Sequence, residues 1–235
     1  MNILNILYIS IFKEKIMRVF TILFFSLVTL FSCSAEGSNE VSGTIDGGLR
    51  VLQVQDKTAD LEFTIYRGDY IVFDFENDGT YKFKVPELDV DTIMPAPEAE
   101  KSYIKMKKSG DYSFTLGSRN GVFHVLELVD ASYHEVTAAE AEALIKNVNP
   151  IIIDVRTSGE YQSGHLSDSE LLPVQVFADN IANLEKFKNE DILLYCASGN
   201  RSTVAARMLI DAGFTKVYNL RSGIGDWARK GHPVE

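Results

Sequence analysis

The hydrophobic pattern of the chain changes its period once, between residues 130 and 136. Before this point apolar and polar residues alternate, as at Leu61, Phe63 and Ile65, and a period of two is typical of β-strands with one buried face. After it, short apolar runs at 151–155, 192–196 and 217–220 alternate with segments of helical pattern. We therefore expect two domains: an all-β sandwich over 41–130, and an α/β domain with a mostly parallel sheet over 131–235.

Turn and cap residues refine these expectations. In the β region, alternation continues through 71–75 and 81–85, and Gly68-Asp69, 77–79 and 109–111 supply turns. In the α/β region, Thr137 with Glu140 and Thr157 with Glu160 have the spacing of a capping box, which predicts that helices begin there. Further helices are expected near 178–188 and over 202–212.

The N-terminus has the pattern of an export signal. Residues 19–31 are uncharged and almost wholly apolar, but the run is shorter than the ~20 residues that span a membrane. The ending 30–33, Leu-Phe-Ser-Cys, resembles the lipobox of bacterial lipoproteins. That resemblance implies a signal peptide over 1–32, lipidation of Cys33 and a polar tether over 33–40. The alternative is a cleaved signal with a coincidental cysteine.

Two further expectations concern this segment. Lys13 and Lys15 follow an apolar stretch instead of opening the chain, so we expect translation to begin at Met17. Ser34 after the lipidated cysteine places such a protein in the bacterial cell envelope, at the outer membrane facing the periplasm in a Gram-negative cell.

Composition excludes several classes of function. Acidic residues outnumber basic ones by 33 to 23, the net charge is −10, and no basic cluster is present, which argues against nucleic-acid binding. The four histidines are scattered without ligand spacing and no Walker loop occurs, so we expect no metal and no cofactor. The two cysteines allow at most one disulfide, and lipidation of Cys33 would leave Cys196 without an intramolecular partner.

Cys196 ends an apolar strand and starts a loop that leads into a helix. In parallel α/β sheets, functional groups collect at the carboxyl ends of strands beside helix N-termini. The helix N-terminus, the loop amides and Arg201 would each favour the thiolate, which is the nucleophilic form of a cysteine. Cys196 is therefore the candidate catalytic residue, and a buried structural thiol is the alternative.

Residues from about 137 to 235 resemble a single-domain rhodanese, a thiosulfate sulfurtransferase. The resemblance lies in Asp154-Val-Arg156 with Glu160, in Gly164-His165, in the strand and loop 193–202 (LLYCASGNRS), and in 212–214, 217–220, 223–224 and Trp227. Four residues separate Cys196 from Arg201, whereas related dual-specificity phosphatases have five, and the shorter loop suits a single sulfur atom.

The resemblance implies a covalent cycle through a Cys196 persulfide, fed by a donor such as thiosulfate and emptied by a thiol or cyanide. It also implies that the amides of the loop hold the persulfide anion, at residues Ala197, Ser198, Gly199, Asn200 and Arg201. A non-catalytic persulfide carrier, a thiol-sensing module and a structural lipoprotein are the alternatives.

Residues around the loop are expected to support it without reacting. Asp154, Arg156, Glu160 and His165 are expected to brace the loop, and Ser202 to cap the following helix. Arg201 has two open interpretations, as an anion-binding group or as the partner of a nearby acid. The family's Pro-Gly after Gly-His-Ile is missing here, and Asp168 and Glu170 predict an acidic entrance that would disfavour thiosulfate.

Residues 41–130 resemble a cupredoxin, chiefly at 68–73 and 110–114. A copper-bearing member would carry Cys, His and Met in the loop that follows, but 116–122 contains none of them. Because His124 stands alone, no copper is expected. An unrelated β-sandwich is the alternative, and either fold would serve as a spacer or docking module whose protein partner the sequence does not name.

Overall fold

The computed structural model describes residues 41–235, apart from 56–58, 77–78 and 96–102. The signal peptide, Met17, Ser34 and the lipidation of Cys33 lie outside the described residues. Residues 41–235 form one compact unit. Among these residues, every helix is too short or too polar to cross a bilayer.

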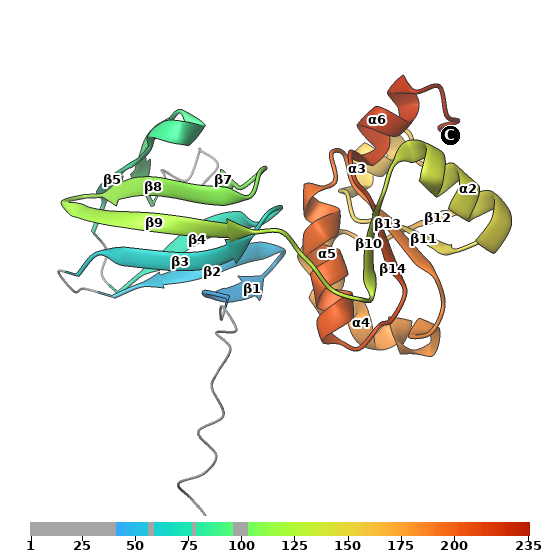
Figure 1. The fold of residues 1–235 in the computed structure, drawn as a ribbon, viewed down its shortest axis with the longest axis horizontal. Coiled ribbons are helices and arrows are strands. Elements are labelled where there is room, and N and C mark those ends of the chain that lie inside the picture. The colour runs from blue at the N-terminus through green and yellow to red at the C-terminus, as the bar shows by residue number, and fades with distance from the viewer. Residues whose placement is uncertain (1–40, 56–58, 77–78, 96–102) are drawn as a thin grey trace, which may run out of the picture. The chain divides into compact units, whose positions relative to one another are not determined.

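The β region contains two sheets (Figure 1). One has the order β1-β2-β4-β7 and the other β3-β9-β8-β5-β6. Their strands are β1 (Thr44–Asp46), β2 (Leu49–Val54), β3 (Leu61–Tyr66), β4 (Tyr70–Phe75), β5 (Tyr81–Val85), β6 (Val90–Met94), β7 (Ile104–Lys105), β8 (Gly110–Leu116) and β9 (Arg119–Leu126), with a short 3-10 helix η1 (Pro86–Leu88) between β5 and β6. Two pairs are parallel, β2 with β4 and β3 with β9, and the other pairs are antiparallel.

Apolar side chains of both sheets meet in one core. Leu52 and Ile71 come from the first sheet, and Phe63, Phe83 and Phe123 from the second. The alternation that predicts strands at 61–65, 71–75 and 81–85 places Phe63, Ile71 and Phe83 inward, because successive side chains of a strand point to opposite faces.

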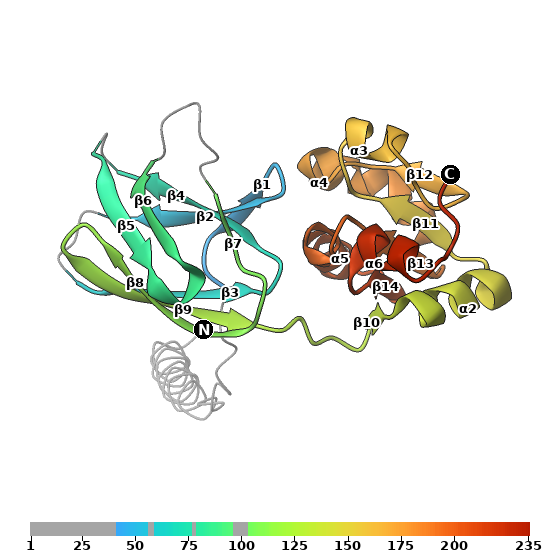
Figure 2. The same cartoon turned by 90° about the horizontal axis from the view of Figure 1, so that it is seen from above.

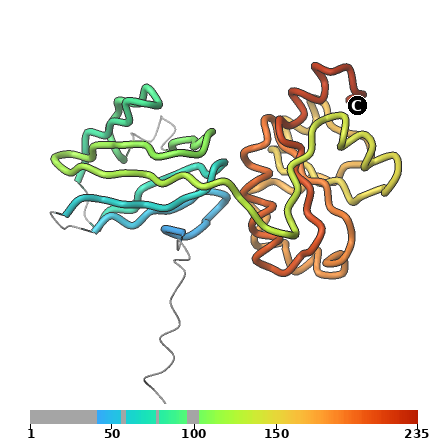
Figure 3. Tube along the Cα trace, in the orientation of Figure 1, coloured from blue at the N-terminus to red at the C-terminus, as the bar shows by residue number. Residues whose placement is uncertain are grey.

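The α/β region has a five-stranded, all-parallel sheet of order β10-β14-β13-β11-β12. Its strands are β10 (Tyr133–Val136), β11 (Ile151–Asp154), β12 (Ser169–Leu171), β13 (Ile192–Tyr195) and β14 (Val217–Leu220). Its helices are α2 (Ala138–Val148), α3 (Ser158–Gln162), α4 (Val174–Leu184), η2 (Glu185–Phe187), α5 (Asn200–Asp211) and α6 (Gly223–Arg229). Figure 3 traces the chain from β9 into β10, where the period of the sequence changes.

Both faces of this sheet are covered. Ile192 and Leu194 of β13 point into a core shared with α4 and α5, which lie side by side in Figure 2. Leu193 and Tyr195 point the other way, into a core shared with α2 and α6. Burial on both faces explains why this strand is a continuous apolar run without alternation.

Several boundaries differ from the sequence prediction. Both capping boxes are confirmed, with Thr137 opening α2 and Thr157 opening α3. Strand β10 (Tyr133–Val136), which the sequence pattern does not predict, pairs with β14 and lies within the domain expected over 131–235. Helix α4 begins at Val174, directly after Pro173, instead of near residue 178. Such shifts arise because sheet pairing and packing, which are not local, determine where elements end.

Candidate active site

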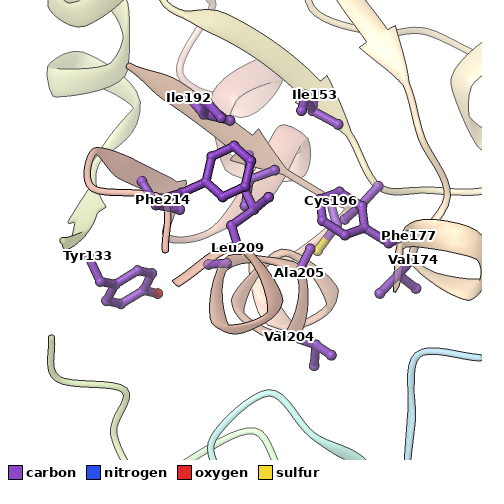
Figure 4. Packing of buried hydrophobic residues seen from close by; sticks show 14 of the residues in the cluster. Tyr133, Ile153, Val174, Phe177, Ile192, Cys196, Val204, Ala205, Leu209 and Phe214 are labelled. Atoms are coloured by element: carbon purple, nitrogen blue, oxygen red, sulfur yellow. The ribbon is translucent and has the colours of Figure 1, made fainter. Parts of the chain in front are cut away.

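Cys196 follows β13 directly and occupies the expected position at the carboxyl end of a central strand. The loop then turns at Gly199 into α5. Figure 4 shows the Cys196 side chain beside Phe177 and Ala205, in the core between the sheet and the helices. Its exposed fraction is 1%, so the thiol is recessed and lies away from bulk water.

Two hydrogen-bond donors face the sulfur. The backbone N–H of Gly199 donates to Sγ at 3.2 Å, and the Ser202 hydroxyl lies 3.6 Å from it. The prediction that Ser202 caps the helix is wrong, because α5 begins two residues earlier with Gly199 as its N-cap. Ser202 is instead fully buried in the first turn, where its hydroxyl can donate to a thiolate or persulfide.

The loop backbone is held by glycines. Gly199 has φ +88°, and a Cβ there would overlap the carbonyl oxygen of Arg221. Gly223 has φ +64°, and a Cβ there would overlap the carbonyl oxygen of Cys196. The N–H of Ile224 donates to that same carbonyl at 2.9 Å, so a hydrogen bond holds the loop against the start of α6.

The remaining loop residues lie in different environments. Ala197 and Ser198 are exposed, whereas Gly199 and Asn200 are buried. Of the amides predicted to hold the persulfide, that of Gly199 bonds to the sulfur in this structure. The loop therefore presents one amide and one hydroxyl to Sγ, and leaves its tip at Ala197 and Ser198 accessible.

Arg201 forms an ion pair with Glu160, which lies in the first turn of α3. Nη1 and Nη2 of the guanidinium donate to the two carboxylate oxygens at 2.7 and 2.6 Å. The Arg201 hydrogen bonds lower the pKa of Glu160 to about 2, and the same hydrogen bonds raise the pKa of Arg201. Of the two interpretations of Arg201, pairing with an acid is the one this structure contains.

Replacement of Glu160 by Gln is expected to reduce stability in a pH-dependent way. The folded-state pKa of about 2 lies below the ordinary value of 4.5, so the pair stabilises the fold fully above about pH 4.5 and progressively less as the pH falls towards 2. Because the carboxylate is about one third exposed, the difference at pH 7 should not exceed ~1 kcal/mol. Urea unfolding of both proteins at pH 7 and pH 3 measures it. A difference that is as large at pH 3 as at pH 7 would contradict the assignment.

Asp154, the last residue of β11, and Arg156 form a buried ion pair. Nε and Nη2 of Arg156 contact the Asp154 carboxylate at 2.9 and 2.6 Å, and Nη2 also donates to the carbonyl of Gly164 at 2.6 Å. Asp154 has no exposed surface and Arg156 is 6% exposed. This pair ties the end of β11 to the segment that carries His165.

His165 stacks on Tyr161, with ring centroids 3.9 Å apart. Its Nδ1 lies 3.2 Å from the Tyr161 carbonyl, and its backbone N–H and carbonyl pair with Glu235. These contacts position the segment between α3 and β12. No described contact joins the His165 ring to Cys196.

Asn219 is a site residue that sequence reasoning missed. Its buried side-chain amide donates to the Gly199 carbonyl at 3.3 Å, to Thr203 Oγ1 at 3.0 Å and to the Tyr133 hydroxyl at 2.9 Å. Burial raises the pKa of Tyr133 to about 12, so this hydroxyl keeps its proton. The sequence signal for this residue is an amide side chain inside the predicted buried strand 217–220, because buried polar side chains usually have hydrogen-bond partners.

His124 of the β region lies between two carboxylates. Its Nδ1 is 2.8 Å from Asp111 and its Nε2 is 3.0 Å from Glu62. Hydrogen bonds to these acids, that to Asp111 foremost, raise the pKa of His124. Within the described ranges of the chain, no three His, Cys, Asp or Glu side chains are grouped closely enough to hold a metal ion.

A pocket of about 360 Å³ opens beside Arg201. Its charged lining residues are Glu160, Arg201 and Lys105, the last from the β region. Asp168 and Glu170, which predicted an acidic entrance, do not line it. Glu170 lies in β12, at the sheet edge beyond β11, and Asp168 directly precedes that strand. Because Cys196 is not among the residues that line this pocket, the acidic entrance to the cysteine stays a prediction.

The fold and the site together define a class of protein, a parallel α/β domain with a recessed cysteine between the end of a central strand and the N-terminus of a helix. Residues 137–230 match the family model of the rhodanese-like domain. The chain belongs to the rhodanese-like family.

Known relatives cover the same part of the chain. An uncharacterized Escherichia coli K12 protein, YibN, is 32% identical over 100 residues, which cover 42% of this chain and 70% of YibN. A sulfurtransferase of Allochromatium vinosum is 33% identical over 94 residues, covering 40% of this chain and 86% of that protein. Among solved structures, a rhodanese-related protein of Thermoplasma volcanium has 29% identity and a TM-score of 0.40, covering 44% of this chain and 98% of that one.

Proposed function

We propose that the protein is a sulfurtransferase that moves sulfane sulfur through a persulfide on Cys196. The observation that carries the proposal is the sulfur itself, recessed at the end of β13 with the Gly199 amide and the Ser202 hydroxyl directed at it. A persulfide anion formed there would meet two hydrogen-bond donors in a site shielded from water. The sulfurtransferase activity named for the Allochromatium relative supports the same chemistry.

The proposed cycle has two displacement steps. The Cys196 thiolate attacks the outer sulfur of thiosulfate, an S–S bond forms, the S–S bond of thiosulfate breaks, and sulfite leaves with the electron pair. A cyanide ion or an acceptor thiolate then takes the outer sulfur, giving thiocyanate or a new persulfide, and the Cys196 thiolate is regenerated. No oxidant or reductant is consumed, and the cycle predicts ping-pong kinetics.

A turnover assay separates this proposal from a carrier that holds sulfur without releasing it repeatedly. Purified wild type should form many equivalents of thiocyanate from thiosulfate and cyanide, and Cys196→Ala should form none above background. Mass spectrometry of wild type treated with thiosulfate alone should show one added sulfur atom on Cys196. A stable persulfide with no thiocyanate beyond one equivalent would instead assign the carrier function.

We propose further that the enzyme is exported and anchored by a lipid on Cys33, with the β region as a cupredoxin-like spacer or docking module that lacks copper ligands. The apolar run 19–31 followed by Leu-Phe-Ser-Cys supports the anchor, and the two facing sheets of 41–130 support the sandwich. Incorporation of labelled palmitate that is lost in Cys33→Ala tests the anchor. Failure of the wild type to label would contradict it.

A further inference from the structure

Three side chains of the β region form a cluster on one sheet face. Tyr70 of β4 lies directly opposite Lys105 of β7, and Tyr103 precedes Lys105 by two residues, so all three share a face. The rings of Tyr70 and Tyr103 meet edge to face with centroids 5.2 Å apart. Lys105 Nζ lies 5.3 and 5.7 Å from the two ring centroids, within the range of a cation–π interaction.

This Tyr70–Tyr103–Lys105 cluster lines the same pocket as Arg201 and Glu160. Burial foremost, and then a negative charge on Cys196, raise the pKa of Tyr70. Tyr70 belongs to the β region and Arg201, which ends the cysteine loop, to the α/β region, and both line the pocket. The pocket connects the cluster to the rim of the cysteine loop.

Backbone contacts of the β3–β4 turn hold the cluster in place. Gly68 has φ +101° and packs so closely on α5 that a Cβ would lie 2.8 Å from the Asn200 carbonyl oxygen. The Gly68 N–H donates to the Met106 carbonyl at 2.7 Å, and the Met106 N–H donates to Asp69 at 3.0 Å, which links the turn to the residue after β7. Arg67 adds an ion pair with Glu135 of β10. The turn thus couples β4 and β7 to the first turn of the helix that carries Ser202.

The charges of the pocket favour an anionic ligand. Arg201 neutralises Glu160, and Lys105 forms no ion pair with a carboxylate of the described residues. Among the described residues that line the pocket, one positive charge is therefore left unpaired at neutral pH, and it lies over the rings of Tyr70 and Tyr103. A volume of about 360 Å³ is in the range of sites for organic molecules, and it is several times larger than a thiosulfate ion requires.

We propose that the cluster is a subsite for the acceptor, and that the acceptor is an organic thiol that carries a carboxylate. Lys105 binds the carboxylate, the rings of Tyr70 and Tyr103 contact the carbon chain, and the thiol is directed towards Cys196. The acceptor thiolate attacks the outer sulfur of the Cys196 persulfide, the S–S bond of the persulfide breaks, and the thiolate of Cys196 is restored as an organic persulfide leaves. The assignment rests on the proposed sulfurtransferase function.

The test compares two acceptors that differ only at the end remote from sulfur. Sulfur transfer from thiosulfate is measured with 3-mercaptopropionate, which has a carboxylate, and with 2-mercaptoethanol, which has a hydroxyl. The measured quantity is the kcat/KM for 3-mercaptopropionate divided by the kcat/KM for 2-mercaptoethanol. Lys105→Gln should lower this ratio about tenfold relative to wild type, because a charge-assisted hydrogen bond to the carboxylate is lost. Lys105→Arg should keep the ratio. Lys107→Gln, an exposed change in the same segment that leaves the pocket lining intact, is the matched control.

An unchanged ratio in Lys105→Gln overturns the subsite while leaving the cysteine chemistry in place. If wild type transfers sulfur to no acceptor, cyanide included, the proposed function fails instead. The subsite is then tested by calorimetric titration of 3-mercaptopropionate into Cys196→Ala with and without Lys105→Gln. Weaker binding in the double variant supports the subsite, and equal binding overturns it.

Discussion

Replacement of Gly199 by Ala is expected to reduce sulfur transfer at least 100-fold. The new methyl group would overlap the Arg221 carbonyl oxygen, which belongs to backbone and cannot swing aside like a flexible side chain. The residue also has φ +88°, a conformation that non-glycine residues adopt only with strain. The loop must therefore shift, and Gly199 carries the amide that bonds to Cys196 Sγ. Displacing catalytic groups by about 1 Å commonly costs a factor of ~100 in rate.

The measurement is the thiosulfate–cyanide turnover of Gly199→Ala together with its urea unfolding curve. Strain and overlap should also lower the free energy of unfolding by ~3 kcal/mol. Gly159→Ala is the matched control, because Gly159 lies in α3 without a positive φ and an added Cβ there meets open space. Wild-type turnover by Gly199→Ala would show that the hydrogen bond from the Gly199 amide to Cys196 Sγ is not needed for the reaction.

Replacement of Asp154 by Ala is expected to lower the free energy of unfolding by ~3–5 kcal/mol. The change leaves the guanidinium of Arg156 buried without its carboxylate, and the desolvation of an unpaired charge is not recovered elsewhere. It also removes the acceptor of the Arg156 backbone N–H, which bonds to Asp154 Oδ1 at 2.9 Å. The sulfur-transfer rate of the folded fraction should fall by a smaller factor than the folding equilibrium constant. The reason is that neither Asp154 nor Arg156 contacts the sulfur in the described structure.

Chemical denaturation of Asp154→Ala, Arg156→Met and the double variant measures this effect as a cycle. The double variant should be more stable than Asp154→Ala, because it no longer contains a lone buried charge. Glu142→Ala, which breaks the exposed i,i+4 pair with Lys146, should change the unfolding free energy by less than ~0.5 kcal/mol. A loss in Asp154→Ala no larger than that of Glu142→Ala would contradict the assignment of a buried, stabilising pair.

Most secondary structure of the α/β region could be predicted, because its signals are local. A capping box lies within four residues, and a buried strand such as 192–195 is a continuous apolar run. Strand β10 was missed, since Tyr133–Val136 has no apolar run and becomes a strand only by pairing with Val217–Leu220. The sequence predicts the start of α5 two residues too late, because Ser202 has the side chain of a typical N-cap but the Cys196 loop turns into the helix earlier, at Gly199.

In the site, the sequence by itself determined that Cys196 directly follows a strand and that four residues separate it from Arg201. These features depend only on neighbours along the chain, so pattern and spacing suffice to predict them. Only the tertiary structure showed that Arg201 forms an ion pair with Glu160 and that the Asn219 amide donates to the Gly199 carbonyl. It also showed that Tyr70 and Lys105 line the adjoining pocket. Their partners are 20 to 131 positions away in the chain, and such contacts arise from sheet order and packing, for which no local pattern codes.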